Sequence, residues 1–248
     1  MKTAVIVDSV RTGLAKSHRG GFNMTRADDM LAHIINGMLD RNPNLPPEMV
    51  EDVIMGCGNP EGAMGHNIGR NAAVLSNLPI TVGGTTVNRY CSSSLQTIRM
   101  AAHAIKAGEG DAFIAAGVEC VSRYGKGNAD SLPDTANPIF KAPGERSKVR
   151  AEGGHGDWAP AEGLPDLFIA MGQTAENVAE LKGVSREAMD EYGVLSQNKA
   201  EAAISRGFFE MDITPVTMPD GTVVSTDDGP RAGVTLSLIH ISEPTRPY

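Results

Sequence analysis

A cysteine at the junction of an expected strand and an expected helix is the residue of this chain best placed to do chemistry. Cys91 follows a β-branched run at 82–87 and precedes apolar residues that recur at helical spacing as far as Gly108. The free N–H groups and the dipole at a helix start favour negative charge and so stabilise a thiolate. A thiolate can attack a carbonyl carbon and hold an acyl group.

Three serines follow this cysteine and argue against a purely structural role. A free cysteine taken alone is most simply interpreted as a small buried hydrophobic residue. Ser92, Ser93 and Ser94 bring hydroxyl groups that need hydrogen-bond partners, and packing does not explain them. We therefore expect Cys91 to be a nucleophile.

Four segments, in order along the chain, resemble motifs of one enzyme family. V-N-R-Y-C-S-S-S-L-Q at 87–96 resembles the acyl-thioester cysteine signature of the thiolases, which exchange acyl groups between coenzyme A thioesters. M-G-Q-T-A-E-N-V-A at 171–179 resembles a segment of the thiolase loop domain, and D-D-G-P-R at 227–231 resembles its later D-E-x-x-R segment. A-V-I-V-D-S-V-R-T at 4–12 is similar to the family's first strand and turn. The resemblance extends to about Leu236.

The resemblance implies roles for three residues. Cys91 would carry the acyl group, Met171 would line the acyl groove, and Arg231 would contact the nucleotide end of coenzyme A. Core packing is the alternative for Met171. Ser94 stands where many thiolases carry glycine and would narrow the acyl pocket, and Ala170 in place of histidine favours a broad 3-ketoacyl-CoA thiolase. The implied partners are acyl-CoA and coenzyme A as substrates, with no tightly bound cofactor and no metal.

Composition and charge exclude other classes of function. The chain has 248 residues, 41% of them hydrophobic, which is enough to bury a large core. Its formal net charge of −8 provides no basic face for nucleic acid. With no stretch long enough to span a membrane and no signal-peptide pattern, we expect a cytoplasmic protein. No G-x-G-x-x-G or P-loop spacing follows a strand, which disfavours a nucleotide-binding α/β protein.

The cysteines are expected to be free thiols. Cys57, Cys91 and Cys120 are odd in number, widely spaced and without a C-x-x-C pair, so neither a disulfide framework nor a zinc site is indicated. Cys57 and Cys120 each follow an expected strand, which favours a structural role. His66 lies in a glycine-rich turn that could present it to a site, but a solvated or helix-capping histidine is the simpler interpretation.

Strands and helices alternate in the first part of the chain, which predicts an α/β layered domain. Strands are expected at 4–8, 53–55, 82–87 and 112–115, and helices at 27–39, 68–75, from Cys91 to Gly108, at 170–180 and, capped by Ser185, at 186–205. The resemblance implies a thiolase-like layered fold. In that fold this chain would hold the first half with a long loop-domain insertion, and the second half would be absent.

Between residues 118 and 165 glycine and proline interrupt every pattern, which predicts a long irregular excursion. Stretches of this kind are usually lids or binding loops, and this one matches the thiolase loop domain. A basic run within it comprises Lys141, Arg146, Lys148 and Arg150. The run could meet coenzyme A phosphates or be an ordinary solvated face that neighbouring glutamates partly neutralise.

We expect a thiolase N-terminal α/β domain at 1–117, the loop domain and return segment at 118–236, and a non-native tail at 237–248. The tail resembles a translated sequencing adapter, which predicts a truncated gene model. The G-H-P, N-x-x-G-G and C-x-G segments that supply the family's base and oxyanion donors do not occur in this sequence.

The parent enzyme would cleave 3-ketoacyl-CoA or condense acetyl-CoA in fatty acid metabolism, as a homodimer or homotetramer. Because those segments do not occur, this chain is expected to be inactive alone. The alternative is a noncatalytic fragment that binds coenzyme A or acyl chains.

Overall fold

The computed structural model describes residues 2–124, 133, 135–153 and 162–241. The remaining parts of the expected excursion, and residues 242–248 of the expected tail, lie outside the described residues. By their internal contacts the residues form two compact units. The first unit takes residues 1–127 and 207–229, and the second takes 128–206 and 230–248. The segment 207–229 therefore packs with the N-terminal residues.

The first unit is an α/β structure. Its elements in chain order are α1 (Ala27–Arg41), β1 (Val50–Gly56), α2 (Ile68–Leu75), β2 (Gly83–Val87), α3 (Ser93–Ala107), β3 (Ala112–Gly117), β4 (Val216–Thr217) and β5 (Val223–Val224). The first six confirm the helices and the three later strands that the sequence predicts in this region. β4 and β5 form a separate antiparallel hairpin.

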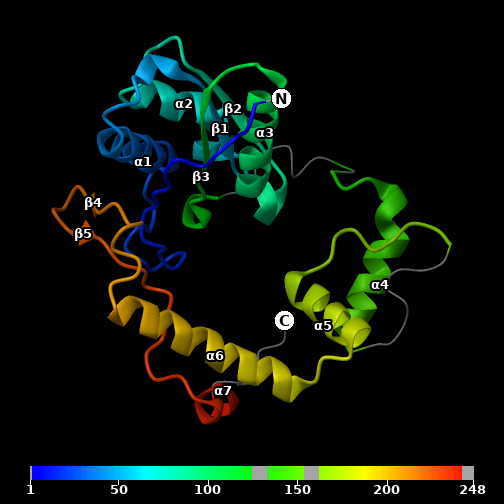
Figure 1. Ribbon diagram of the computed structural model, residues 1–248. Coiled ribbons are helices and arrows are strands. Elements are labelled where there is room, and N and C mark those ends of the chain that lie inside the picture. The colour runs from blue at the N-terminus through cyan, green and yellow to red at the C-terminus, as the bar shows by residue number, and fades with distance from the viewer. Residues whose placement is uncertain (1, 125–132, 134, 154–161, 242–248) are drawn as a thin grey trace. The chain divides into compact units, whose positions relative to one another are not determined.

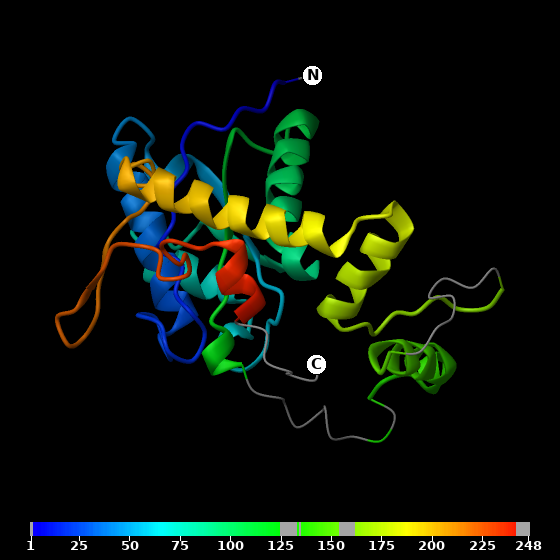
Figure 2. The same ribbon diagram turned by 90° about the horizontal axis from the view of Figure 1, so that it is seen from below.

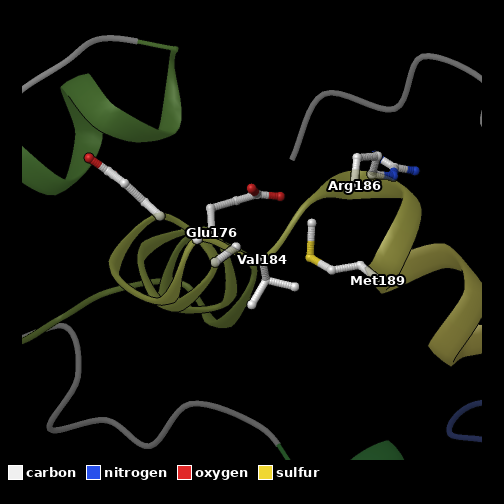
Figure 3. A pocket seen from close by; sticks show the side chains of 7 residues that line it. Glu176, Val184, Arg186 and Met189 are labelled. Carbon is white, nitrogen blue, oxygen red and sulfur yellow. The ribbon is translucent and has the colours of Figure 1, made fainter.

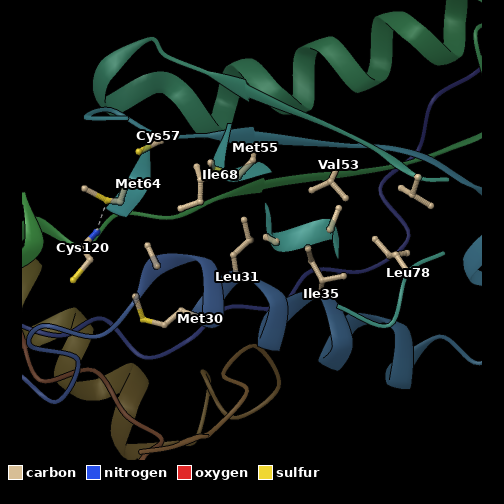
Figure 4. Close-up of a cluster of buried hydrophobic side chains, with 14 of the residues drawn as sticks. Met30, Leu31, Ile35, Val53, Met55, Cys57, Met64, Ile68, Leu78 and Cys120 are labelled. Carbon is tan, nitrogen blue, oxygen red and sulfur yellow. Dashed lines mark hydrogen bonds between the residues drawn. The ribbon is translucent and has the colours of Figure 1, made fainter. Parts of the chain in front are cut away.

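Three parallel strands form the central sheet in the order β2-β1-β3 (Figure 1). Helices α1 and α2 lie on one face of this sheet and α3 lies on the other (Figures 1 and 4). Parallel strands need crossover connections, and the crossover helices bury both faces of the sheet. The predicted α/β layered fold is confirmed, and it is consistent with the thiolase-like fold that the resemblance implies.

The main hydrophobic core lies between α1, α2 and the sheet (Figure 4). Leu31 and Ile35 of α1 pack with Val53 and Met55 of β1 and with Ile68 of α2, and each of the five is at most 2% exposed. Burying a side chain of this size stabilises the fold by roughly 1.5–3 kcal/mol. Packing in the core therefore holds β1 in place, and with it the residues that directly follow the strand.

The strand predicted at residues 4–8 is not formed, so that prediction is wrong. Residues 5–7 are more than 70% exposed and belong to no strand in the described part of the chain. The β-bridge nearest to this segment lies after it, between Arg11 and Ile213. A β-branched run forms a strand only where a neighbouring edge supplies hydrogen bonds and a surface to cover it.

Arg11 and Asp227 tie the N-terminal segment to the return segment of the first unit. The guanidinium donates two hydrogen bonds to the carboxylate, at 2.7 and 2.9 Å, and the Leu14 N–H donates a third at 2.7 Å. The hydrogen bonds from Arg11 are the main cause that lowers the pKa of Asp227, and the same pairing raises the pKa of Arg11. Asp227, in the D-D-G-P-R segment, thus has a structural role.

The second unit is helical in its described residues. It contains α4 (Lys141–Ala151), α5 (Met171–Lys182), α6 (Arg186–Ser205) and α7 (Leu236–Ile241) (Figure 2). The predicted cap of α6 is confirmed, because the Ser185 hydroxyl oxygen accepts a hydrogen bond from the Ala188 N–H at 3.2 Å. No helix in the described part of the chain has the length and apolar character needed to cross a membrane.

Helix α4 overturns the expectation that residues 118–165 are irregular throughout. Proline and glycine led to that expectation, because they usually interrupt helices. Pro143, however, is the third residue of α4, in the first turn, where backbone N–H groups have no partner inside the helix. A proline at this position therefore removes no helical hydrogen bond.

Asp227→Asn is expected to lower the free energy of unfolding by about 2 kcal/mol at pH 7, since a hydrogen bond to a charged group contributes roughly 1.5–3 kcal/mol. The pKa of Asp227 is lower in the folded state than in the unfolded chain. Its contribution is therefore present above the unfolded value of about 3.9 and is lost as pH falls through the folded value.

Urea denaturation between about pH 7 and pH 3 measures this difference. Asp40→Asn, which alters an exposed carboxylate of α1, is the control. Equal losses for the two variants, or a loss for Asp227→Asn that does not shrink at low pH, would contradict the assignment.

Candidate functional site

Cys91 lies in the short 3₁₀ turn Tyr90–Ser92, immediately before the first residue of α3. It is exposed, whereas Cys57 and Cys120 are buried. The predicted strand-turn-helix junction is therefore present, and it carries an accessible thiol at a helix start. Such a position favours a reactive cysteine over a structural one.

The turn before α3 is held by its own polar groups. Tyr90 has a φ of 45°, a left-handed conformation that is strained in a bulky residue. Its N–H donates to Asn88 Oδ1 at 2.8 Å. The Ser93 hydroxyl accepts from the Arg89 N–H at 2.8 Å and donates to the Tyr90 carbonyl at 2.6 Å. The buried Ser93 thus has the partners that its hydroxyl requires, and the position of Cys91 is set by residues on both sides.

Two glycines let α3 begin close to the sheet. Gly56 of β1 and Gly117 of β3 are register partners at the carboxyl ends of their strands. A Cβ placed on Gly56 would lie 2.6 Å from the Ser94 backbone nitrogen, and a Cβ placed on Gly117 would collide with the Ser94 hydroxyl. Only glycine permits this approach. The paired glycines therefore allow the turn that carries Cys91 to lie over the strand ends.

Helix α3 buries small side chains rather than its apolar ones. The buried residues are Ser93, Thr97 and Ala101, each four positions after the last. Leu95 and Ile98, whose spacing predicts the helix, are 68% and 41% exposed. The helix is confirmed, but the face that it buries is made of residues small enough to pack against glycine.

A cavity of about 250 Å³ opens beside Cys91, at the carboxyl ends of β1 and β3. Its lining includes Gly58, Tyr90, Ser94 and Glu119. In parallel α/β sheets, ligands characteristically bind beyond the carboxyl ends of the strands. The cavity is therefore where a molecule could meet the thiol.

Glu119 is a lining residue that the sequence analysis did not single out. Cys57 donates its thiol proton to this carboxylate across 3.6 Å. Burial, and secondly the charge of Glu119, raise the pKa of Cys57 to about 11, so Cys57 remains a neutral thiol. The sequence signal that could have found Glu119 was its position. Cys57 directly follows β1 and Glu119 is the second residue after β3, and the carboxyl ends of these parallel strands meet at one edge of the sheet.

The two other predicted site residues belong to the second unit. Met171 begins α5 and is 71% exposed, so packing within its own unit does not account for it. Arg231 is exposed, and its backbone N–H donates to Gln197 Oε1 at 3.0 Å. His66, the remaining candidate, lies in the first unit, is exposed, and has a φ of 54°.

Two residues of the predicted basic run hold the second unit together. Arg146 pairs at 2.9 Å with Asp166, whose side chain is 1% exposed. Arg150, with a side chain only 10% exposed, pairs at 2.7 Å with Glu180. These contacts favour a structural interpretation of both arginines. Lys148, which lies 3.9 Å from a glutamate one turn later, is 76% exposed.

A larger cavity of about 570 Å³ lies in the second unit, beside the turn between α5 and α6 (Figure 3). Glu176, Val184, Arg186 and Met189 are among the residues that line it. Its lining contains no thiol, hydroxyl or imidazole group, and Arg186 is paired with Asp190 at 3.0 Å. The Cys91 cavity is therefore the better candidate for covalent chemistry.

The thiolase N-terminal domain family matches residues 4–245 of this chain. The chain belongs to the thiolase family. This assignment confirms the resemblance drawn from the cysteine signature and the three other segments, and it confirms the thiolase-like fold. In the part of this thiolase chain that the structure describes, no group of three or more His, Cys, Asp and Glu residues is arranged to hold a metal ion.

Curated relatives of this thiolase chain carry thiolase names. The beta-ketoadipyl-CoA thiolase of Acinetobacter baylyi is 40% identical over 255 residues, which cover 95% of this chain and 58% of that protein. The 3-ketoacyl-CoA thiolase of Aeromonas hydrophila is 38% identical over 214 residues, and that of Shewanella sp. (strain MR-7) is 39% identical over 214 residues; each covers 86% of this chain and 49% of the relative. The chain spans about half the length of the curated relatives it matches.

Gly117→Ala is expected to lower the free energy of unfolding by about 1–3 kcal/mol, the usual cost of overpacking, because the new methyl group collides with the Ser94 hydroxyl. Adding Ser94→Gly removes the obstacle and should restore most of the loss. Urea denaturation in a double-mutant cycle should then give a coupling of about 1 kcal/mol or more.

Gly229→Ala is the matched control, since a Cβ there meets nothing within 4 Å in the same unit. It should change stability by less than about 0.5 kcal/mol. Additive effects at positions 117 and 94 would show that the close approach does not exist in solution.

Proposed function

We propose that Cys91 is the acyl-carrying nucleophile of a thiolase and that this chain holds the nucleophilic half of that enzyme. The observation that supports this most strongly is the exposed thiol at the start of α3, beside a cavity at the strand ends. Membership in the thiolase family supports the same chemistry. The enzyme is thus an acyltransferase that acts on coenzyme A thioesters.

In the proposed reaction the Cys91 sulfur attacks the carbonyl carbon of an acyl-CoA. The bond from that carbon to the coenzyme A sulfur breaks, and coenzyme A leaves as a thiolate that takes up a proton. The dipole of α3 favours the negative charge on the attacking sulfur, which lies next to the N-terminal end of that helix. In condensation the acyl group then passes to the α-carbon of a second acetyl-CoA, which gives up a proton. In cleavage the Cys91 sulfur instead attacks the 3-keto carbon of a 3-ketoacyl-CoA, the bond between C2 and C3 breaks, and C2 takes up a proton so that acetyl-CoA leaves. The acyl group on Cys91 then passes to the sulfur of a free coenzyme A, which gives up its proton.

In this proposal the second unit binds the remaining parts of the substrate. Met171 lines the acyl groove, and Arg231 contacts the nucleotide end of coenzyme A. We propose 3-ketoacyl-CoA as the substrate class, a choice that Ala170 and the names of the Aeromonas and Shewanella relatives favour. The full-length parent would act in fatty acid metabolism as a homodimer or homotetramer.

We infer that this chain by itself turns over slowly. No histidine lines the Cys91 cavity in the described residues, and the sequence has no G-H-P, N-x-x-G-G or C-x-G segment. Removing one oxyanion donor costs an enzyme about 3–4 kcal/mol of transition-state stabilisation. A single acylation of Cys91 is therefore expected rather than repeated turnover.

Incubation with acetyl-CoA is expected to add one acetyl group to the chain, on Cys91, because this thiol alone among the three cysteines is exposed. Intact-mass and peptide-mass measurements locate the adduct, and hydroxylamine should release it. Cys91→Ala should take no acetyl group, whereas Cys120→Ala, which alters a buried cysteine, should still take one. Coenzyme A binding of equal strength in wild type and Cys91→Ala, without any adduct, would favour the noncatalytic binding alternative.

Arg231→Glu is expected to weaken coenzyme A binding about tenfold, which corresponds to roughly 1.4 kcal/mol, because it opposes the nucleotide phosphates with a negative charge. Isothermal titration calorimetry with coenzyme A measures the change. Lys182→Glu makes the same charge reversal at the exposed end of α5 in the same unit and should leave the affinity unaltered. An unaltered affinity in Arg231→Glu would remove Arg231 from the binding site.

A further inference from the structure

Glu119 holds the backbone that follows β1. Its carboxylate accepts hydrogen bonds from the N–H groups of two consecutive residues, Gly58 at 2.7 Å and Asn59 at 3.2 Å. The Cys57 thiol is a third donor, at 3.6 Å. Two successive N–H groups directed at one anion form a strong, charge-assisted contact. The segment after β3 and the segment after β1 are thus joined at the edge of the Cys91 cavity.

Gly58 lies close to the turn that carries Cys91. A Cβ placed on Gly58 would lie 3.2 Å from the Glu119 carboxylate and 3.7 Å from the backbone of Tyr90. The Glu119 carboxylate and the residue before Cys91 therefore lie together on the side of Gly58 where a side chain would stand. Tyr90 has a strained φ of 45°, and strained residues persist only where their surroundings hold them.

We propose that Glu119 is a positioning residue for acyl transfer: it holds residues 57–59 beside Tyr90, at the cavity that they share with Cys91, and so fixes the direction of the Cys91 thiol. This inference depends on the proposed function of Cys91. A displacement of about 1 Å between reacting groups can lower a rate by up to about a hundredfold. The contacts that hold the turn carrying Cys91 therefore affect the reaction rate. In this role the negatively charged carboxylate of Glu119 acts by accepting hydrogen bonds from backbone N–H groups.

The test compares two reactions of the same thiol. Acetylation of Cys91 by acetyl-CoA needs a correctly directed sulfur, whereas alkylation by the small reagent iodoacetamide needs only access and a thiolate. Peptide-mass mapping gives both rates for Cys91, and alkylation of the buried Cys120 reports loss of folding. The variants are Glu119→Ala and Glu119→Gln. Glu109→Ala, which removes an exposed carboxylate after the far end of α3, is the control.

Glu119→Ala is expected to lower the acetylation rate about tenfold and to leave alkylation of Cys91 unchanged, because the small reagent does not depend on the direction of the sulfur. Glu119→Gln keeps one acceptor oxygen at the same reach and should recover part of the acetylation rate. Glu109→Ala should match wild type in both reactions.

An unchanged acetylation rate in both Glu119 variants, with wild type acetylated normally, overturns this inference and leaves the proposed function intact. If Cys120 becomes reactive in Glu119→Ala, that variant has lost its fold, and the result for Glu119→Gln decides. An unchanged ratio of acetylation to alkylation in that variant overturns the inference. A wild-type chain that takes no acetyl group at Cys91 overturns the proposed function and this inference together.

Discussion

The close approach of α3 to the carboxyl ends of β1 and β3 is the constraint on which the candidate site depends. Gly56 and Gly117 are partners across the two strands, and the backbone and side chain of Ser94 occupy the space that a Cβ on either would need. A larger residue at position 56, where the obstacle is the backbone of residues 93 and 94, would push the helix start away from the sheet. Cys91 would move with it, because the thiol lies in the turn immediately before the helix.

Different kinds of interaction support the two sides of this contact. Beneath the sheet, apolar packing of α1 and α2 against β1 keeps the strand ends in place. Above it, the turn is held by polar groups. The left-handed conformation of Tyr90 costs roughly 1–3 kcal/mol, and two hydrogen bonds offset this cost: the Tyr90 N–H donates to Asn88, and the Ser93 hydroxyl donates to the Tyr90 carbonyl. Polar contacts suit this place because the thiol must remain open to solvent.

The two units hold different candidate residues for the proposed acyl transfer. The first unit contains the thiol and its cavity. In the second unit, the two half-buried arginines of the basic run, Arg146 and Arg150, pair with carboxylates of the same unit. Positive charge in an acidic chain is therefore not by itself a sign of a phosphate site.

Local spacing in the sequence determined most helices, three strands of the first unit and the location of Cys91 at a strand-helix junction. Those features depend on residues within one or two turns of each other. Tertiary structure decided the exposed segment at 4–8, the buried face of α3 and the roles of Asp227 and Glu119. Asp227 meets a partner 216 residues away, and Glu119 meets one 62 residues away. Contacts of that separation follow from how strands and helices pack, which no local pattern encodes.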